Sequence, residues 1–271
     1  MNFQEIIQDA AWTMENLLSQ QECQKIIQDA STTGMKQANG DIRHRNNFNH
    51  KFQDKILSEI LWSRLSDLVP SKYIIRDPEN HPAGFIPYSP QNMLGTWHPY
   101  AINTHFSVLY YKDGGHFGPH RDNHIKLSEH EQSMLTVGIY LNDRPDGSGG
   151  ATHFLCNDTD APAVDDATNR IQAPESSILV KVSADRAGKA VLFHHGLLHE
   201  GGVILGEKNP KWLLLTQVLY RRDESTAPLL SQDQKLAREL LEQAEQAEVQ
   251  SEFGLAMRLY KQAYRLDPSL E

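Results

Sequence analysis

The stretch FSVLYYKDGGHFGPHRD, residues 106–122, contains the pattern that best predicts the fold of this 271-residue chain. An apolar run rich in β-branched and aromatic residues leads into the turn Lys112-Asp-Gly-Gly115, and such runs bounded by glycine predict strands. Similar runs follow at MLTVGIYLN (134–142), ATHFL (151–155), SILVKV (177–182), KAVLFHH (189–195) and WLLLTQVLY (212–220). Many short strands separated by turns indicate an antiparallel sandwich or barrel.

The residues before this region predict helices. Residues 1–70 are expected to be mainly helical, because Ser19-Gln-Gln-Glu22 resembles a capping box and residues 52–69 repeat apolar side chains at helical spacing. The second helix is expected to end at Pro70. Its predicted apolar face consists of Ile56, Ile60, Leu61, Leu65 and Leu68.

Two loops and a C-terminal helical hairpin complete the predicted organisation. Residues 71–96 and 157–176 are rich in turn formers, and we expect them to be loops at the rim of a cavity. From Pro228 two helical patterns follow, which resemble a single tetratricopeptide repeat ending at Asp267-Pro268. One repeat cannot bury its own apolar face, so the hairpin either packs on the strand domain or docks a partner protein. The expected domain boundaries are 1–95, 96–223 and 224–271.

Composition restricts the class of function. With 39% hydrophobic and 23% charged residues, the chain has the composition of a soluble globular protein. A net charge of −9 argues against binding to nucleic acid or to an anionic membrane, since both need clustered basic residues. Two distant cysteines, no basic apolar leader and no apolar run of roughly 18 residues together favour a cytoplasmic location.

The pair His120-Arg-Asp122 is a candidate for half of a metal site. Side chains at positions i and i+2 of a strand project to the same side, so the imidazole and the carboxylate can share one cation. With a second histidine they would form a facial triad, which leaves three adjacent positions open on a non-haem iron. The pair alone is weak evidence, because one such pair is expected by chance. His194, His195 and His199, at the end of a later strand, are the candidates for the third ligand.

Several stretches, in order, resemble the prolyl 4-hydroxylase group of the iron(II)/2-oxoglutarate oxygenases. The resemblance covers roughly residues 103–222 and extends more loosely back to about residue 13. It implies an α+β fold with a double-stranded β-helix, or jelly-roll, core between supporting N-terminal helices and the C-terminal hairpin. The matching stretches are YKDGGHFGPHRD, LTVGIYLND, GGATHF, GKAVLF, LHEGG and KWLLLTQVLYRR.

The resemblance also assigns roles to residues of this chain. It implies that His120, Asp122 and His199 bind Fe(II), and that His194 and His195 are structural or support the site. Of the two lysines after His199, it selects Lys211 over Lys208 to pair with the distal carboxylate of 2-oxoglutarate. Additional residues implied for 2-oxoglutarate are Tyr111 and Tyr140, and those implied weakly for substrate are Arg45 and Asn47.

The implied activity is hydroxylation of a peptidyl, prolyl-like substrate or an amino-acid-like one, with release of succinate and CO2. The implied cofactors and co-substrates are Fe(II), 2-oxoglutarate and O2, and the group also suggests ascorbate. Two alternatives stay open from sequence: a small-molecule hydroxylase on the same scaffold, and a non-catalytic jelly-roll used for binding or scaffolding. Repair of alkylated nucleic acid fits poorly with the acidic balance of the chain.

Overall fold

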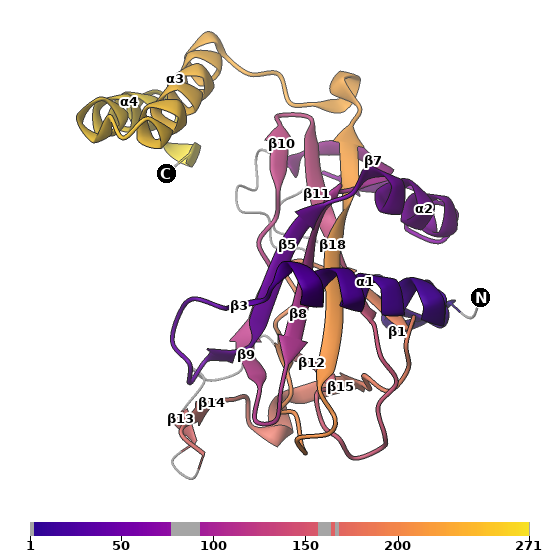
Figure 1. The fold of residues 1–271 in the computed structure, drawn as a ribbon. Coiled ribbons are helices and arrows are strands. Elements are labelled where there is room, and N and C mark those ends of the chain that lie inside the picture. The colour runs from indigo at the N-terminus through magenta and orange to yellow at the C-terminus, as the bar shows by residue number, and fades with distance from the viewer. Residues whose placement is uncertain (1–2, 77–92, 157–163, 166–167, 271) are drawn as a thin grey trace. The chain divides into compact units, whose positions relative to one another are not determined.

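The computed structural model describes residues 3–76, 93–156, 164–165 and 168–270 (Figure 1). Much of the two expected rim loops, 77–92 and 157–163, therefore lies outside the described residues. The chain forms two compact units. The larger includes Met1–Tyr73 and Trp97–Arg221, and the smaller includes Arg222–Glu271.

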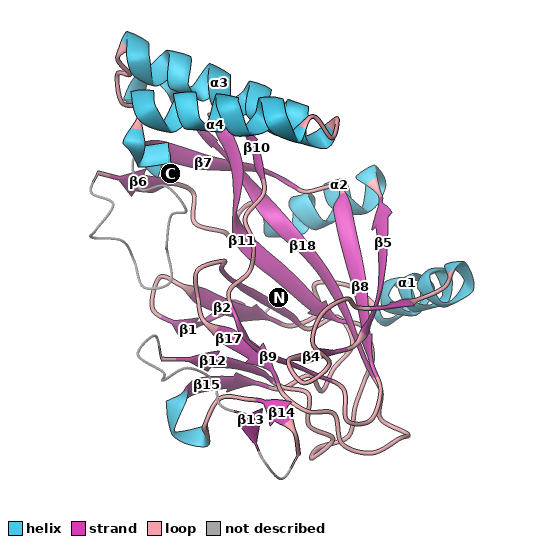
Figure 2. Ribbon diagram, turned by 90° about the vertical axis from the view of Figure 1, so that its left-hand side faces the viewer, coloured by secondary structure: helices cyan, strands magenta, loops and turns pink. Residues whose placement is uncertain are grey.

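The larger unit contains two facing antiparallel sheets that together form a jelly roll (Figure 2). Eight strands build it, and the chain crosses repeatedly from one sheet to the other. In the large sheet the order is β16-β11-β18-β8, and in the small sheet it is β15-β12-β17-β9. The predicted double-stranded β-helix is therefore confirmed. Its strands are β8 (His105–Tyr111), β9 (His116–His120), β11 (Glu131–Tyr140), β12 (Thr152–Leu155), β15 (Ile178–Val182), β16 (Ala190–His194), β17 (His199–Gly201) and β18 (Lys211–Arg222).

Strand β11 lies at the centre of the large sheet, between β16 and β18. All but the first of its residues are buried, which explains why the part from Met134 to Tyr140 does not alternate between apolar and polar residues. Facing strands contribute Leu109, Tyr140, Phe154, Phe193 and Leu213 to one apolar cluster between the sheets. This core holds the strands that carry the candidate metal ligands.

The N-terminal region differs from the prediction of a mainly helical leader. Residues 3–7 and 11–14 form a hairpin whose second strand pairs with β16, so that Ala11, Trp12 and Met14 are buried in the large sheet. Tertiary pairing of this kind overrides the local helical preference of a short segment.

The strands outside the jelly roll come from several parts of the chain. They are β1 (Phe3–Ile7), β2 (Ala11–Met14), β3 (Lys36–Gln37), β4 (Arg45–Asn46), β5 (Phe48–Gln53), β6 (Tyr73–Ile75), β7 (Gly95–Ile102), β10 (Lys126–Ser128), β13 (Val164–Asp165) and β14 (Arg170–Ile171).

Two predicted helices are present, α1 (Gln20–Thr33) and α2 (Lys55–Leu65), on the side of the large sheet away from the small one (Figure 2). The predicted capping box is confirmed: Ser19 Oγ accepts from the backbone N–H of Glu22, and the Glu22 carboxylate accepts from the backbone N–H of Ser19. Helix α2 ends at Leu65, before Leu68 and Pro70. Its predicted apolar face is only partly correct, because Leu61 and Leu65 are buried whereas Ile56 is 70% exposed.

The smaller unit contains the predicted C-terminal hairpin, α3 (Gln232–Val249) and α4 (Phe253–Leu266). Its buried side chains are mostly alanines, which lets the two helices pack closely. Arg238 Nη1 lies 2.9 Å from Asp267 Oδ2, so the closing aspartate of the repeat-like pattern ties the end of the hairpin to its first helix. Among the described residues, no helix is long and apolar enough to cross a membrane.

Gly188 is a fold position that no other residue should occupy. Its φ of +81° favours glycine, and a Cβ there would lie 2.0 Å from the backbone oxygen of Leu18. Its N–H donates to Tyr140 O and its carbonyl accepts from Leu17 N–H, which joins the end of β11 and the turn before β16 to the residues before α1. We therefore expect Gly188→Ala to lower the free energy of unfolding by more than about 3 kcal/mol in chemical denaturation.

Gly34→Ala is the matched control, because Gly34 also has a positive φ, of +102°, but nothing lies within 4 Å of its would-be Cβ. That variant should lose only about 1 kcal/mol through backbone strain. Equal losses in the two variants would contradict the role assigned to the Leu18 contact.

Candidate metal centre

Strand pairing brings the candidate metal ligands together. His120 ends β9 and His199 begins β17, and these two residues are direct partners in the small sheet. Asp122 lies just beyond β9, where its backbone N–H donates to His195 O at 3.0 Å. One ligand atom from each of His120, Asp122 and His199 lies within 4.8 Å of the others.

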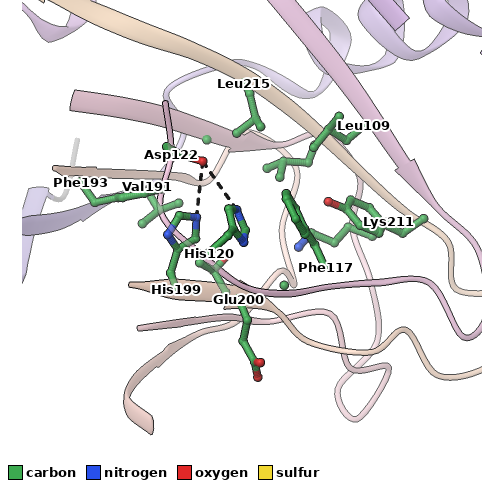
Figure 3. A pocket seen from close by; sticks show the side chains of 15 residues that line it. Leu109, Phe117, His120, Asp122, Val191, Phe193, His199, Glu200, Lys211 and Leu215 are labelled. Atoms are coloured by element: carbon green, nitrogen blue, oxygen red, sulfur yellow. Dashed lines mark ion pairs between the residues drawn. The ribbon is translucent and has the colours of Figure 1, made fainter. Parts of the chain in front are cut away.

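The two imidazoles face the carboxylate through the same ring atom (Figure 3). Nε2 of His120 lies 3.6 Å from Asp122 Oδ1, and Nε2 of His199 lies 3.8 Å from it. Each Nδ1 lies near the backbone carbonyl two residues earlier, at 2.8 Å from Gly118 O and 2.9 Å from Leu197 O. A carbonyl can only accept, so Nδ1 carries the proton in both rings and each Nε2 presents its lone pair.

Electrostatics keep His199 and Asp122 in the protonation states that a metal needs. Burial lowers the pKa of His199 to about 4, so its ring is neutral near pH 7. Burial alone would raise the pKa of Asp122, but His199, His120 and the Thr136 hydroxyl outweigh that effect and hold it well below its usual range. Two imidazoles and one carboxylate are the donor set of non-haem Fe(II) sites, so these residues fit that ion.

The neighbouring histidines take other roles in the structure. His195 hydrogen-bonds through Nδ1 to Thr136 and through Nε2 to Ser133, both at 2.9 Å. His194 Nε2 lies 3.2 Å from Asp9 O, and its ring packs against Trp12 and Tyr73. Neither ring joins the group formed by His120, Asp122 and His199.

A cavity between the two sheets extends from these residues to Lys211 (Figure 3). Its walls are mainly apolar, and Phe117 stacks on the His120 ring with centroids 3.5 Å apart. In Figure 3, Lys211 lies beyond Phe117 from the three candidate ligands, and Glu200 points away from them. The remaining walls include Leu109, Tyr111, Gly138, Thr152, Val191, Phe193, Leu213 and Leu215.

Lys211 is buried and has no acidic partner among the residues that the structure describes. It is 2% exposed, and its Nζ donates to Gly150 O at 2.7 Å. Burial, reinforced by the charge of Arg144, lowers the pKa of Lys211 to about 7. Lys208, the alternative considered from sequence, is exposed. A buried ammonium that has no carboxylate beside it favours an anionic ligand.

Arg144 lies behind the cavity near Lys211, and the sequence did not reveal it because it lies in what looked like an ordinary turn. Its guanidinium is buried and donates to backbone carbonyls, including Gly149 O at 2.8 Å and Ser148 O at 2.8 Å. Among the described residues, neither Arg144 nor Lys211 forms an ion pair with a carboxylate. Two basic side chains therefore lie near this end of the cavity, Lys211 in its wall and Arg144 behind Gly150, and no acidic group of the described chain pairs with either.

The two tyrosines predicted to contact 2-oxoglutarate differ in position. Tyr111 lines the cavity, with its ring 5.3 Å from Lys211 Nζ. Tyr140 lies equally close to Lys211, but its hydroxyl is 2.8 Å from Thr152 Oγ1 and it does not line the cavity. Thr152 does line it, and the GGATHF stretch could have pointed to this residue.

The residues weakly predicted for substrate lie next to the cavity wall. Arg45 on β4 pairs with Phe117 on β9, and its guanidinium lies 4.4 Å from the centre of the Phe117 ring. Arg45 Nε donates to Asn47 Oδ1 at 2.7 Å. Asn47 is 1% exposed, and its Nδ2 donates to Phe48 O, so its amide is engaged within the protein.

Known structures with a similar arrangement include three prolyl hydroxylases. A Trichoplax adhaerens prolyl hydroxylase, solved with a hypoxia inducible factor oxygen degradation domain peptide fragment, is 16% identical with a TM-score of 0.49, covering 83% of this chain and 89% of that one. The viral collagen prolyl hydroxylase from Paramecium bursaria Chlorella virus-1 is 14% identical with a TM-score of 0.46, and the match covers 78% of this chain and 96% of that one. A Pseudomonas putida prolyl-4-hydroxylase is 13% identical with a TM-score of 0.47, and the match covers 79% of this chain and 93% of that one.

A search of curated protein sequences finds no match. A family model, by contrast, matches residues 106–216 and describes the 2OG-Fe(II) oxygenase superfamily. The matched segment begins within β8 and ends within β18, and it contains the other six jelly-roll strands, the three candidate metal ligands and Lys211. Over residues 106–216, this chain thus matches the model of the 2OG-Fe(II) oxygenase superfamily.

Proposed function

We propose that the protein is an Fe(II)- and 2-oxoglutarate-dependent dioxygenase that hydroxylates a prolyl-like peptide or an amino-acid-like substrate, releasing succinate and CO2. The observation that carries the proposal is the group of His120, Asp122 and His199. Its two Nε2 atoms face one carboxylate oxygen, and both rings are fixed by backbone carbonyls. The family match of residues 106–216 supports the same chemistry.

In this proposal His120 Nε2, His199 Nε2 and Asp122 Oδ1 bind the metal. Three protein ligands leave three adjacent positions for a bidentate 2-oxo acid and for oxygen. When bound, Fe(II) supplies oxygen activation coupled to decarboxylation of 2-oxoglutarate. Phe117 and Phe193 contact the two imidazoles and shield them from water.

The other end of the cavity would hold the distal carboxylate of 2-oxoglutarate. Lys211 supplies an ammonium, and Arg144 adds a second positive charge behind Gly150. A carboxylate in an apolar cavity must be matched by charge and hydrogen bonds, and this is where the chain provides both. The Tyr111 hydroxyl is the additional contact that we propose, since Tyr111 lines the cavity.

For substrate contact we propose Arg45. Its guanidinium lies over Phe117, a wall of the cavity, and it forms no ion pair within the described part of the chain. Asn47 holds the Arg45 side chain in place through its amide oxygen. Arginine donors suit the backbone carbonyls of a peptide or a free carboxylate.

Anaerobic titration with Fe(II) and 2-oxoglutarate should produce the visible metal-to-ligand band of a bound 2-oxo acid. Asp122→Ala and His199→Ala each remove a proposed ligand, so their Fe(II) affinity should fall by at least about 100-fold. Asp146→Ala is the control, because Asp146 is exposed and lies outside the metal group. An unchanged band in both ligand variants would refute the assignment of these residues.

The binding of 2-oxoglutarate should weaken as the pH rises above about 7, the pKa of Lys211. Below that pH the free protein already carries the ammonium that pairs with the carboxylate. Above it binding must take up a proton, so the dissociation constant should rise by up to about tenfold per pH unit. Lys211→Met should bind 2-oxoglutarate weakly and lose this dependence when titrated between pH 7 and 8.5.

Lys208→Met is the matched control for Lys211, since Lys208 is an exposed lysine three positions earlier. It should retain both the affinity and the pH dependence of the unchanged protein. If Lys208→Met loses them and Lys211→Met does not, the sequence alternative that placed Lys208 at the co-substrate is correct.

The substrate class is tested by succinate release. Proline-containing peptides should stimulate 2-oxoglutarate turnover above the uncoupled rate, and the peptide should gain the mass of one oxygen atom. Free amino acids and other small molecules form the comparison set. Stimulation by small molecules alone would overturn the peptidyl part of the proposal and leave the dioxygenase chemistry intact.

A further inference from the structure

A chain of hydrogen bonds extends from the second oxygen of Asp122 into the large sheet. Asp122 Oδ2 lies 2.7 Å from Thr136 Oγ1, and Thr136 Oγ1 lies 2.9 Å from His195 Nδ1. His195 Nε2 lies 2.9 Å from Ser133 Oγ, which in turn accepts from the backbone N–H of Ile125 at 2.8 Å. The side chains of Thr136, His195 and Ser133 thus form one continuous chain, which we call the Asp122 support chain.

The direction of every bond in the Asp122 support chain is fixed by its ends. A carboxylate only accepts, so the Thr136 hydroxyl must donate to Asp122. Because the hydroxyl has only one proton and donates it to Asp122, it must accept from Nδ1–H of His195. Nε2 of a neutral His195 then accepts from the Ser133 hydroxyl, whose oxygen receives the Ile125 N–H. Each hydrogen bond in the series therefore has one assigned donor and one assigned acceptor.

Backbone geometry on β11 makes this series possible. Ser133 and Thr136 are three residues apart, and in a regular strand such residues point to opposite faces. The pairing of β11 with β18 shifts register between Ser133 and Leu135, which is a bulge that re-aims the side chains. Both hydroxyls can therefore reach the same imidazole, which comes from the end of β16.

Burial makes the series rigid. Thr136 and Ser133 are each 2% exposed and His195 is 6% exposed, so a broken bond would leave a polar group without water. Asp122 Oδ2 is thereby held at the sheet, while Oδ1 is directed at Nε2 of His120 and of His199.

We propose that Thr136, His195 and Ser133 are positioning residues that make Asp122 a one-oxygen ligand of the metal. The inference rests on the proposed function, since it concerns how the metal is held. Without the Thr136 donor, the carboxylate could turn and bind through both oxygens. It would then occupy one of the positions that the 2-oxo acid and oxygen require, so both metal affinity and the shape of the bound site would change.

The test is a set of threonine and serine variants assayed by anaerobic Fe(II) titration, with 2-oxoglutarate added afterwards. Thr136→Val keeps the side-chain shape and removes the hydroxyl, and it should lower Fe(II) affinity by about 10- to 100-fold and alter the visible band. Thr136→Ser restores the donor and should return affinity to within a few-fold of the unchanged protein. Ser133→Ala should lower affinity less, because it acts through two intervening bonds.

Non-additivity distinguishes the support chain from general destabilisation. In the Thr136→Val background, Ser133→Ala should cause no further loss of Fe(II) affinity, because the connection to Asp122 is already cut. The control is Thr216→Val on β18, which removes another buried hydroxyl, one that donates to Asn103 O. Thr216 follows Leu215, which lines the cavity, so strand alternation directs the Thr216 side chain to the opposite face of the sheet. This variant should lower the melting temperature without changing Fe(II) affinity.

The outcomes separate this inference from the proposed function. If the unchanged protein gives no Fe(II)- and 2-oxoglutarate-dependent band, the proposed function fails. If it gives the band and folded Thr136→Val binds Fe(II) as tightly with the same band, the support chain is refuted alone. If Thr136→Val does not fold, the other two variants decide. The inference would be overturned if Ser133→Ala bound Fe(II) as tightly as the unchanged protein, or if folded Thr136→Ser bound it much more weakly.

Discussion

The antiparallel pairing of β17 with β9 is the constraint on which the site depends. It sets His199 directly opposite His120, although the two lie far apart in the sequence. Asp122 follows His120 by two residues and is tied to His195 through the backbone, so one set of main-chain hydrogen bonds fixes all three groups. Because each Nδ1 is also held by a backbone carbonyl, the orientation of the rings follows from the strands themselves.

Burial of charge shapes the rest of the cavity. At one end Asp122 is stabilised as a carboxylate by imidazoles and by Thr136. At the other end Lys211 and Arg144 are buried among backbone carbonyls without an acidic partner in the described chain. Keeping cations buried in this way costs free energy unless an anion joins them. The proposed metal ligands and the proposed anion site thus lie at two ends of one cavity with mainly apolar walls, which is the layout that a chelating dicarboxylate would require.

Sequence reasoning could reach the jelly roll because its strands are short apolar runs between glycine turns, and their order matched a known family. It could also place His120, Asp122 and His199, the last through resemblance and not through spacing. It failed at residues 3–14, where pairing with β16 determines the structure, and at Ile56, where helical spacing did not correspond to burial. The sequence did not predict roles for Arg144, Thr136 and Ser133. Their contacts depend on residues distant in sequence and on a bulge in β11 that no local sequence pattern indicates.

The most direct test of the account is a crystal structure of the protein grown without oxygen with Fe(II) and 2-oxoglutarate. The proposed site predicts one metal ion bound by Nε2 of His120, Nε2 of His199 and a single oxygen of Asp122. It also predicts that the distal carboxylate of 2-oxoglutarate contacts Lys211. An ion bound through Nδ1 atoms, through both oxygens of Asp122 or at other residues would contradict it, as would 2-oxoglutarate pointing away from Lys211.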